Sequence, residues 1–174
     1  MKNGSIAFLI AAALMCLGAC IANTVSTSTS RDDFKAYIIK WEGCVKEPVI
    51  NDGVITVGIG HRIMTHEGGH DIHLTDADVE RLYQDDLKTA FACARASITS
   101  FDTLPQKVQW VVLSVIWSVG PTRFQDFSGF QLALNHHMYQ IAAVELASSK
   151  WFRQVAPARA MEHYNALGMT PFDP

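Results

Sequence analysis

The sequence predicts a mostly α, α+β fold in which a long helix joins a small β-hairpin lobe to a larger helical lobe. Two observations carry this prediction. Short β-branched runs flank an Asn51-Asp52-Gly53 hinge, and from residue 75 onward the apolar residues recur at helical spacing. Two lobes usually enclose a cleft, and clefts bind ligands, so the sequence also predicts a site between the lobes.

Composition supports a single globular domain. The chain has 174 residues, of which 49% are hydrophobic and 18% charged, enough to bury a core. A net charge of −3 argues against a nucleic-acid binder that works through a broad basic face. The 4 cysteines are too few for a disulfide scaffold. Cys44 and Cys93 could form a disulfide in an oxidising compartment, or could be two packed thiols.

The first 30 residues are predicted to lie outside the fold. Residues 6–22 form an apolar run that is slightly short of the ~20 residues a membrane helix needs. We expect residues 1–22 to be a signal peptide or signal-anchor and residues 23–30 a polar linker. Lipidation at Cys20, ordinary cleavage and a releasable inner-membrane anchor all remain open. Each of the three exports the protein, so the periplasm is the expected compartment.

The folded domain is expected over residues 31–174. Ser30 is a good N-cap for a helix that ends at Glu42, where Gly43 is a favoured terminator. The hairpin pairs residues 49–50 with residues 54–59, and residues 60–74 read as loop. Thr75 is then expected to cap the long amphipathic helix.

The C-terminal half is predicted to be helical. Residues 108–119 are apolar nearly all round, so this helix should be surrounded by other elements, and Gly120-Pro121 should end it. Shorter helices are expected over residues 129–136 with Ser128 as cap, residues 139–148, and residues 157–167 with proline in the opening turn.

His66-Glu67-Gly68-Gly69-His70 fits the H-E-x-x-H pattern of zinc proteases. That chemistry needs a helix, and two glycines cost a helix roughly 2 kcal/mol relative to alanine. The flanks also lack helical periodicity. We therefore disfavour a zinc protease and expect no metal or cofactor, although His61 and His73 leave adventitious metal binding in this loop open.

Glu42 and the hairpin form a candidate of another class. Glycoside hydrolysis needs a carboxylic acid in an apolar setting and a second group that holds the attacking water. Glu42 follows Trp41 on an apolar helix face, and the hairpin would present Asp52 or Thr56 across the cleft. Taken alone, such residues are more often a surface glutamate and a turn aspartate.

These motifs resemble the phage-type lysozymes, glycoside hydrolase family 24. The likeness covers about residues 31–168 in order and rough spacing, and the combination is specific although each block is short. The blocks are Trp41-Glu42-Gly43, residues 53–61 (Gly-Val-Ile-Thr-Val-Gly-Ile-Gly-His), residues 82–87 on the interlobe helix, residues 115–120 on the central helix, and residues 142–152 and 157–160 of the C-terminal pattern.

The resemblance implies a lysozyme-like two-lobed fold and a muramidase that cuts the β-1,4 bond between N-acetylmuramic acid and N-acetylglucosamine in peptidoglycan. Glu42 would be the general acid and Thr56 would help to hold the attacking water. Arg159 matches an arginine that pairs with the catalytic glutamate. His61 matches a histidine that pairs with an aspartate of the interlobe helix, here Asp86.

The sequence departs from the family pattern at the second carboxylate. The family places it six residues before the threonine, where this chain has Ile50. Asp52 would share the face of Ile50 if the strand continued that far, and so could substitute in a shifted hairpin. Otherwise an acid-only lytic transglycosylase or a non-catalytic peptidoglycan-binding domain becomes the alternative. Trp151 would line the cleft or pack in the core.

The expected setting is a phage or prophage endolysin, with a bacterial cell-wall lipoprotein as the alternative. The expected partners are peptidoglycan glycan strands and, through the N-terminal segment, the inner membrane. A monomer is expected. Residues 31–174 carry a net charge of −4, so affinity for an anionic wall would have to come from hydrogen bonds in the cleft.

Overall fold

The computed structural model describes residues 33–51, 54–63 and 72–168, and the chain divides into two compact units, residues 1–40 and 41–174. In the first unit, residues 33–40 are helical, and the rings of Phe34 and Tyr37 lie 6.1 Å apart. The helical stretch ends at residue 42, and Gly43 follows with a φ of 74°, a conformation that favours glycine. The predicted cap, Ser30, lies outside the described residues.

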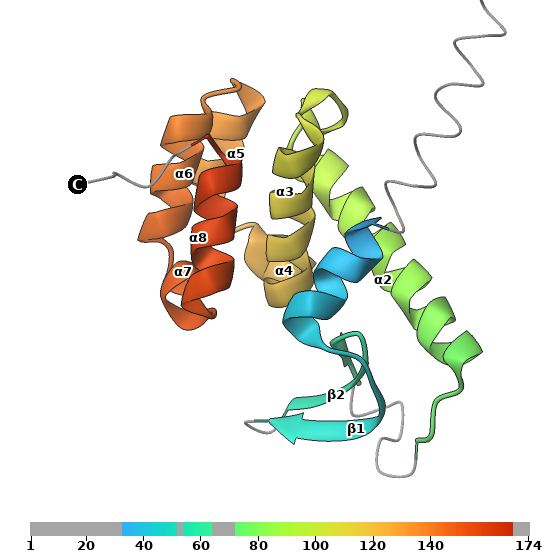
Figure 1. The fold of residues 1–174 in the computed structure, drawn as a ribbon. Coiled ribbons are helices and arrows are strands. Elements are labelled where there is room, and N and C mark those ends of the chain that lie inside the picture. Colours follow the sequence, from blue (N-terminus) through green and yellow to red (C-terminus); the bar gives the residue numbers. More distant parts are fainter. Residues whose placement is uncertain (1–32, 52–53, 64–71, 169–174) are drawn as a thin grey trace, which may run out of the picture. The chain divides into compact units, whose positions relative to one another are not determined.

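The second unit begins with a three-stranded antiparallel sheet of order β1-β2-β3 (Figure 1). The strands are β1 (Val45–Asn51), β2 (Val54–Gly58) and β3 (His61–Arg62), so the predicted hairpin is confirmed. The start of β1 was not predicted, because the pairing register shifts between Val45 and Val49. Pro48 lies in this stretch of the edge strand and interrupts the alternation of apolar and polar residues. The prediction of loop at residues 61–62 is wrong, because a two-residue strand shows no periodicity.

Helix α2 (Asp76–Ser97) connects the sheet to the helices that follow, and it contacts β2, β3 and α3. Its start is a capping box, as the sequence predicts at Thr75: the Asp78 amide donates to Thr75 Oγ1 at 3.2 Å, and the Thr75 amide donates to the Asp78 carboxylate at 3.0 Å. The buried face is the predicted apolar one, made of Val79, Tyr83, Leu87, Ala90 and Ala94.

Helix α3 (Gln106–Val119) is the centre of the helical lobe, as predicted. Figure 1 shows it between α2 and α8 (Pro157–Ala166), and it contacts both. Its buried residues are Val108, Val111, Val112, Leu113, Ser114, Val115 and Ile116. They surround the helix because packed elements cover it on several sides. The helix ends at Gly120, as expected.

The remaining helices are α4 (Pro121–Phe124), α5 (Ser128–Asn135), α6 (Tyr139–Ser148) and α7 (Lys150–Gln154), with a 3₁₀ turn η2 (Phe101–Thr103) before α3. The sequence predicted α5, α6 and α8. It missed α4, α7 and η2, since four or five residues are too few for a helical period. Ser128 does not cap α5: it is the first helical residue, and the N-cap is Phe127. In the described part of the chain, no helix combines the length and apolarity needed to cross a bilayer.

Candidate active site

Glu42 and Arg159, which are 117 residues apart in the sequence, form an ion pair in the second unit. Arg159 Nη1 donates to Glu42 Oε1 at 2.7 Å. The arginine side chain is 6% exposed and the glutamate side chain 21% exposed, so the glutamate faces outward from a buried partner. A charge-assisted bond this short fixes both position and rotamer. One oxygen of Glu42 is thereby committed to the core side.

The guanidinium of Arg159 is itself held by α3. Its Nη2 donates to Ser114 Oγ at 2.9 Å and to the Ser114 carbonyl at 3.3 Å. Trp151 lies against it, with Arg159 Cζ 5.8 Å from the indole ring centroid. Two anchors and an aromatic face hold the arginine in one geometry, so the position of Glu42 depends on three helices.

His163 supports this cluster one helical turn beyond Arg159. Its Nδ1 lies 2.7 Å from the Arg159 carbonyl, which can only accept, so Nδ1 carries the proton. Its ring packs on Trp151 at 5.3 Å. Burial and the nearby Arg159 charge lower the pKa of His163 to about 4. The histidine is therefore neutral at pH 7, and the positive charge of the cluster is that of Arg159.

Gly60 forms the wall beside the second oxygen of Glu42. A Cβ on Gly60 would lie 3.4 Å from both Glu42 Cβ and Glu42 Oε2, and the residue has a φ of 74°. The positive φ favours glycine at this turn, and an added side chain would be in van der Waals contact with Glu42. The turn is fastened to the helical lobe, because Trp117 Nε1 donates to the Ile59 carbonyl at 2.9 Å.

Thr56 lies on the central strand β2 opposite Val49, and its Oγ1 donates to the Val49 carbonyl at 3.4 Å. Cross-strand partners share a face of the sheet. Thr56 therefore lies on the face of Val49 and Arg62, whereas Ile50, which pairs with Ile55, lies on the other face. Asp52 lies outside the described residues.

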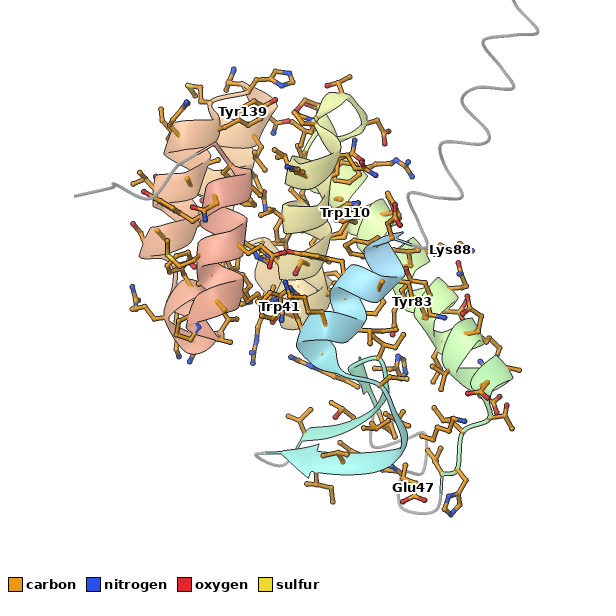
Figure 2. All side chains as sticks on the ribbon, in the orientation of Figure 1. Trp41, Glu47, Tyr83, Lys88, Trp110 and Tyr139 are labelled. Carbon is orange, nitrogen blue, oxygen red and sulfur yellow. The ribbon has the colours of Figure 1, made fainter. Side chains whose placement is uncertain are left out.

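Glu47 is the carboxylate that the described part of the hairpin contains. It lies on β1 and faces the segment before α2, where His73 Nδ1 lies 3.4 Å from Glu47 Oε1 (Figure 2). Both side chains are largely exposed. Glu47 is thus engaged at the outer edge of the sheet.

His61 and Asp86 tie the sheet to α2. His61 Nδ1 lies 3.0 Å and 2.9 Å from the two carboxylate oxygens of Asp86. The pair is part-buried and joins β3 to the middle of α2. Its place beside Gly60 keeps the turn next to Glu42 in register with the helix.

Two cavities adjoin this cluster. A cavity of about 460 Å³ is lined by Gly60, His61 and Asp86 and by the end of α3. A second cavity of about 610 Å³ is lined by Trp151 and by parts of α5, α6 and α7. Val119 and Arg123 line both cavities, so the two are neighbours at the end of α3. Glu42 itself lines neither cavity, but it lies against Gly60, which lines the smaller one, and its partner Arg159 lies against Trp151, which lines the larger one.

The structure therefore brings Glu42 together with Arg159, and His61 with Asp86. Trp151 packs in the core, as one of its two predicted roles has it, with 5% of its surface exposed; it also lines the larger cavity, which lies among the helices. Sequence reasoning missed Ser114 and His163. A serine in a helix that is otherwise apolar all round, and a histidine four residues after the matched arginine, were the available signals.

The other predicted sites are either not assembled in the structure or lie outside the described residues. His66-Glu67-Gly68-Gly69-His70 lies outside the described residues. His61 and His73 have separate partners, and among the residues that the structure describes no three metal-binding side chains converge. Cys44 is exposed and Cys93 is half-buried, and both are free thiols. Burial raises the pKa of the Cys93 thiol.

Comparison with known proteins identifies the family of the chain. The family model for phage lysozyme matches residues 39–161. This span includes every described residue of the cluster except His163. No curated protein matches the chain. Because the model covers well over half of the sequence, the chain belongs to the phage lysozyme family.

Proposed function

We propose that this member of the phage lysozyme family is a muramidase that cleaves the β-1,4 bond between N-acetylmuramic acid and N-acetylglucosamine, with Glu42 as general acid. The observation that carries the proposal is the setting of Glu42, a helix-end carboxylate that is 21% exposed, with one oxygen on a buried arginine and the other beside Gly60, a residue that lines a cavity. A general acid needs this setting, since it must reach the glycosidic oxygen while bulk water is limited.

The two oxygens of Glu42 have different tasks in this mechanism. Oε1 accepts from Arg159, so the proton that moves to the leaving oxygen is carried by Oε2, on the Gly60 side. Arg159 also stabilises the carboxylate that remains after proton transfer. Because Ser114 holds the arginine, the carboxylate keeps its orientation between proton transfers.

We propose that Thr56 helps to hold the attacking water and that Asp52 is the base. The bond from Thr56 Oγ1 to the Val49 carbonyl is long at 3.4 Å, so a water or a sugar hydroxyl can replace it at little cost. Asp52 is the hairpin aspartate nearest in sequence to the family position.

One observation favours a second candidate, a lytic transglycosylase acting on the same bond. The family position of the base is Ile50, which is 58% exposed and faces away from Thr56. In a chain without a base at this face, Glu42 would protonate the leaving oxygen, and the 6-hydroxyl of the muramic acid would attack C1 in place of water. That hydroxyl would give its proton to the Glu42 carboxylate, so the product is 1,6-anhydro-muramic acid.

The test is digestion of purified peptidoglycan by the wild type, Glu42→Gln and Asp52→Asn, with products read by mass spectrometry. Glu47→Gln is the matched control, since it removes an exposed hairpin carboxylate outside the cluster. We expect Glu42→Gln to lose about a thousandfold in rate, as the removal of a general acid does. Asp52→Asn should lose activity as well, and Glu47→Gln should keep it.

The products decide between the candidates. Reducing-end muramic acid from the wild type supports the hydrolase. Anhydro-muramic acid, with Asp52→Asn still active, supports the transglycosylase. Binding without turnover in the wild type would mean a peptidoglycan-binding domain. Cleavage that a chelator abolishes would instead support a metal site at residues 66–70.

We also propose that the chain is exported and acts in the periplasm as a monomer, in contact with the inner membrane through residues 1–22. The apolar run and Cys20 support this part of the proposal. Fractionation of cells expressing the wild type and Cys20→Ser, with the N-terminal mass measured, separates lipidation, cleavage and an uncleaved anchor. Wild-type protein found in the cytoplasm with an intact leader would contradict export.

A further inference from the structure

Helix α6 exposes an apolar face at the edge of the helical lobe. Met138, Ile141 and Val144 recur every three residues, so they form one stripe along the helix, and their exposed fractions are 39%, 50% and 53%. The other side of the helix is buried. On α5, which packs against α6, Leu132 is 59% exposed. These four side chains make up the α5–α6 patch. The outer face of a surface helix is usually polar, so the patch indicates a partner.

The segment that carries the patch is free of strong charge. Residues 127–144 contain no Lys, Arg, Asp or Glu, although at the 18% average of the chain about three of these 18 residues would be charged. The two acidic residues that flank the segment, Asp126 and Glu145, line the larger cavity, which none of the four patch residues does. The Glu145 carboxylate lies so close to Gly129 of α5 that a Cβ there would overlap with it. The acids thus belong to the cavity and not to the patch.

The turn between α5 and α6 carries groups that suit a boundary between lipid and water. His137 Nδ1 lies 3.1 Å from the Tyr139 hydroxyl, and the two rings meet edge to face. Figure 2 shows Tyr139 at the end of this helix pair. Tyrosine is enriched where hydrocarbon gives way to lipid headgroups, because its ring is apolar and its hydroxyl is polar. His136, exposed at the same turn, adds a second hydrogen-bonding ring.

We infer that the α5–α6 patch docks on a phospholipid bilayer, the periplasmic face of the inner membrane. The inference goes beyond the cleavage reaction and rests on the proposed export and membrane contact of residues 1–22. Residues 23–32 separate that segment from the first described helix, and ten residues span at most about 35 Å. A domain tethered this close to a bilayer meets it at high effective concentration, so a small apolar patch suffices for docking.

A bilayer fits the patch better than a second copy of the chain does. A stable protein interface covers about 800 Å² on each partner, and four partly exposed side chains supply much less. A bilayer needs no matching surface, since each apolar side chain that enters it contributes through its own buried area. Figure 1 shows α5 and α6 on the opposite side of α3 from α2 and away from the sheet. Docking through the patch therefore leaves α2 and the sheet uncovered.

The test is photolabelling of the full chain on vesicles of phosphatidylethanolamine and phosphatidylglycerol that contain a photoreactive phospholipid. Residues 124–150 form one tryptic peptide that contains the whole patch, because Lys or Arg occurs in them only at the last position. The test variant combines Ile141→Gln with Val144→Gln. Met161→Gln is the matched control, since Met161 is a 41% exposed apolar residue on α8, outside the patch.

We expect lipid to label residues 124–150 of the wild type about tenfold more than residues 160–174, the peptide that carries Met161. Residues 1–22 should be labelled as well. The double variant should lose about tenfold in labelling of residues 124–150 and keep the labelling of residues 1–22. Met161→Gln should behave as wild type. All three proteins should cleave soluble glycan fragments at equal rates, because the substituted residues lie outside the catalytic cluster.

Labelling of the wild type confined to residues 1–22 would overturn the inference, and so would equal labelling of residues 124–150 in the wild type and the double variant. A wild-type dimer in lipid-free solution that the double variant loses would also overturn it, since a second copy would then cover the patch.

Two further outcomes separate the inference from the proposed function. Labelling of residues 124–150 that depends on Ile141 and Val144, without labelling of residues 1–22, would support the inference and contradict the membrane contact proposed for that segment. The same labelling in a chain that does not cleave peptidoglycan would support the inference and contradict the muramidase.

Discussion

Acidification should destabilise this protein through His163. The side chain is fully buried on α8, its Nδ1 donates to the Arg159 carbonyl at 2.7 Å, and its pKa is lowered from 6.5 to about 4. The unfolded chain takes up a proton on this histidine near pH 6.5, whereas the folded chain does so only near pH 4. Between these values the unfolded state binds more protons, so stability falls as the pH is lowered.

The size of this loss of stability follows from the interval between the two pKa values. At about 1.4 kcal/mol for each pH unit, a fall from pH 6.5 to about 4 removes on the order of 3 kcal/mol of unfolding free energy. This is a large part of the total for a domain of this size, usually about 5–15 kcal/mol. The stabilisation is fully present above pH 6.5 and is lost as the pH falls toward 4.

Urea unfolding between pH 7 and pH 4 measures the effect, with His163→Asn as the test variant. The asparagine amide can replace Nδ1 as donor to the Arg159 carbonyl but does not titrate, so the variant should start lower at pH 7 and lose less on acidification. His136→Asn changes an exposed histidine at the end of α5 and is the control. If wild type and His163→Asn lost stability in parallel, the reasoning about this histidine would be refuted.

Three further predictions concern the cluster and the long helix. Gly60→Ala should lower peptidoglycan cleavage, measured by a turbidity assay, by tenfold or more. The control is Gly120→Ala, because Gly120 has a similar φ of 81° but no atom within 4 Å of an added Cβ. This variant should keep its activity and lose only about 1 kcal/mol of stability, measured by urea unfolding. Ser114→Ala removes the 2.9 Å bond to the buried arginine and should cost about 1–3 kcal/mol and lower activity. A wild-type rate would show that the carbonyl of residue 114 and Trp151 are enough to position the guanidinium. Thr75→Ala removes the helix cap and should cost about 1 kcal/mol by urea unfolding with no loss of specific activity, so a changed activity would mean that α2 also sets the site.

Local rules recovered most of the helices but few of the irregular segments. The capping pair of Thr75 and Asp78, the apolar helix α3 and its stop at Gly120 follow from side chains a few residues apart. The start of β1 did not, because the register shift around Pro48 removes the alternation that identifies a strand. The apparent cap at Ser128 failed because the helix already begins at this residue, with Phe127 as its N-cap.

The candidate site shows the same division. The glutamate at a helix end, the threonine on a strand and the glycine-rich turn could be identified from the sequence because each belongs to a short motif. The surroundings of Arg159 could not, since the signals at Ser114 and His163 are single polar residues that gain a partner only when α3 and α8 pack together. The direction of Ile50 also required the strand register, which a single-residue slip would reverse.

The sequence by itself determined the fold class and the family, because periodicity, caps and short motifs are local properties. Only the tertiary structure decided which oxygen of Glu42 is held by Arg159, that Gly60 lies against the other oxygen, and that Arg62 and Arg123 line one cavity. These are contacts between residues up to 117 positions apart, and they exist only when the sheet and the helices pack around α3.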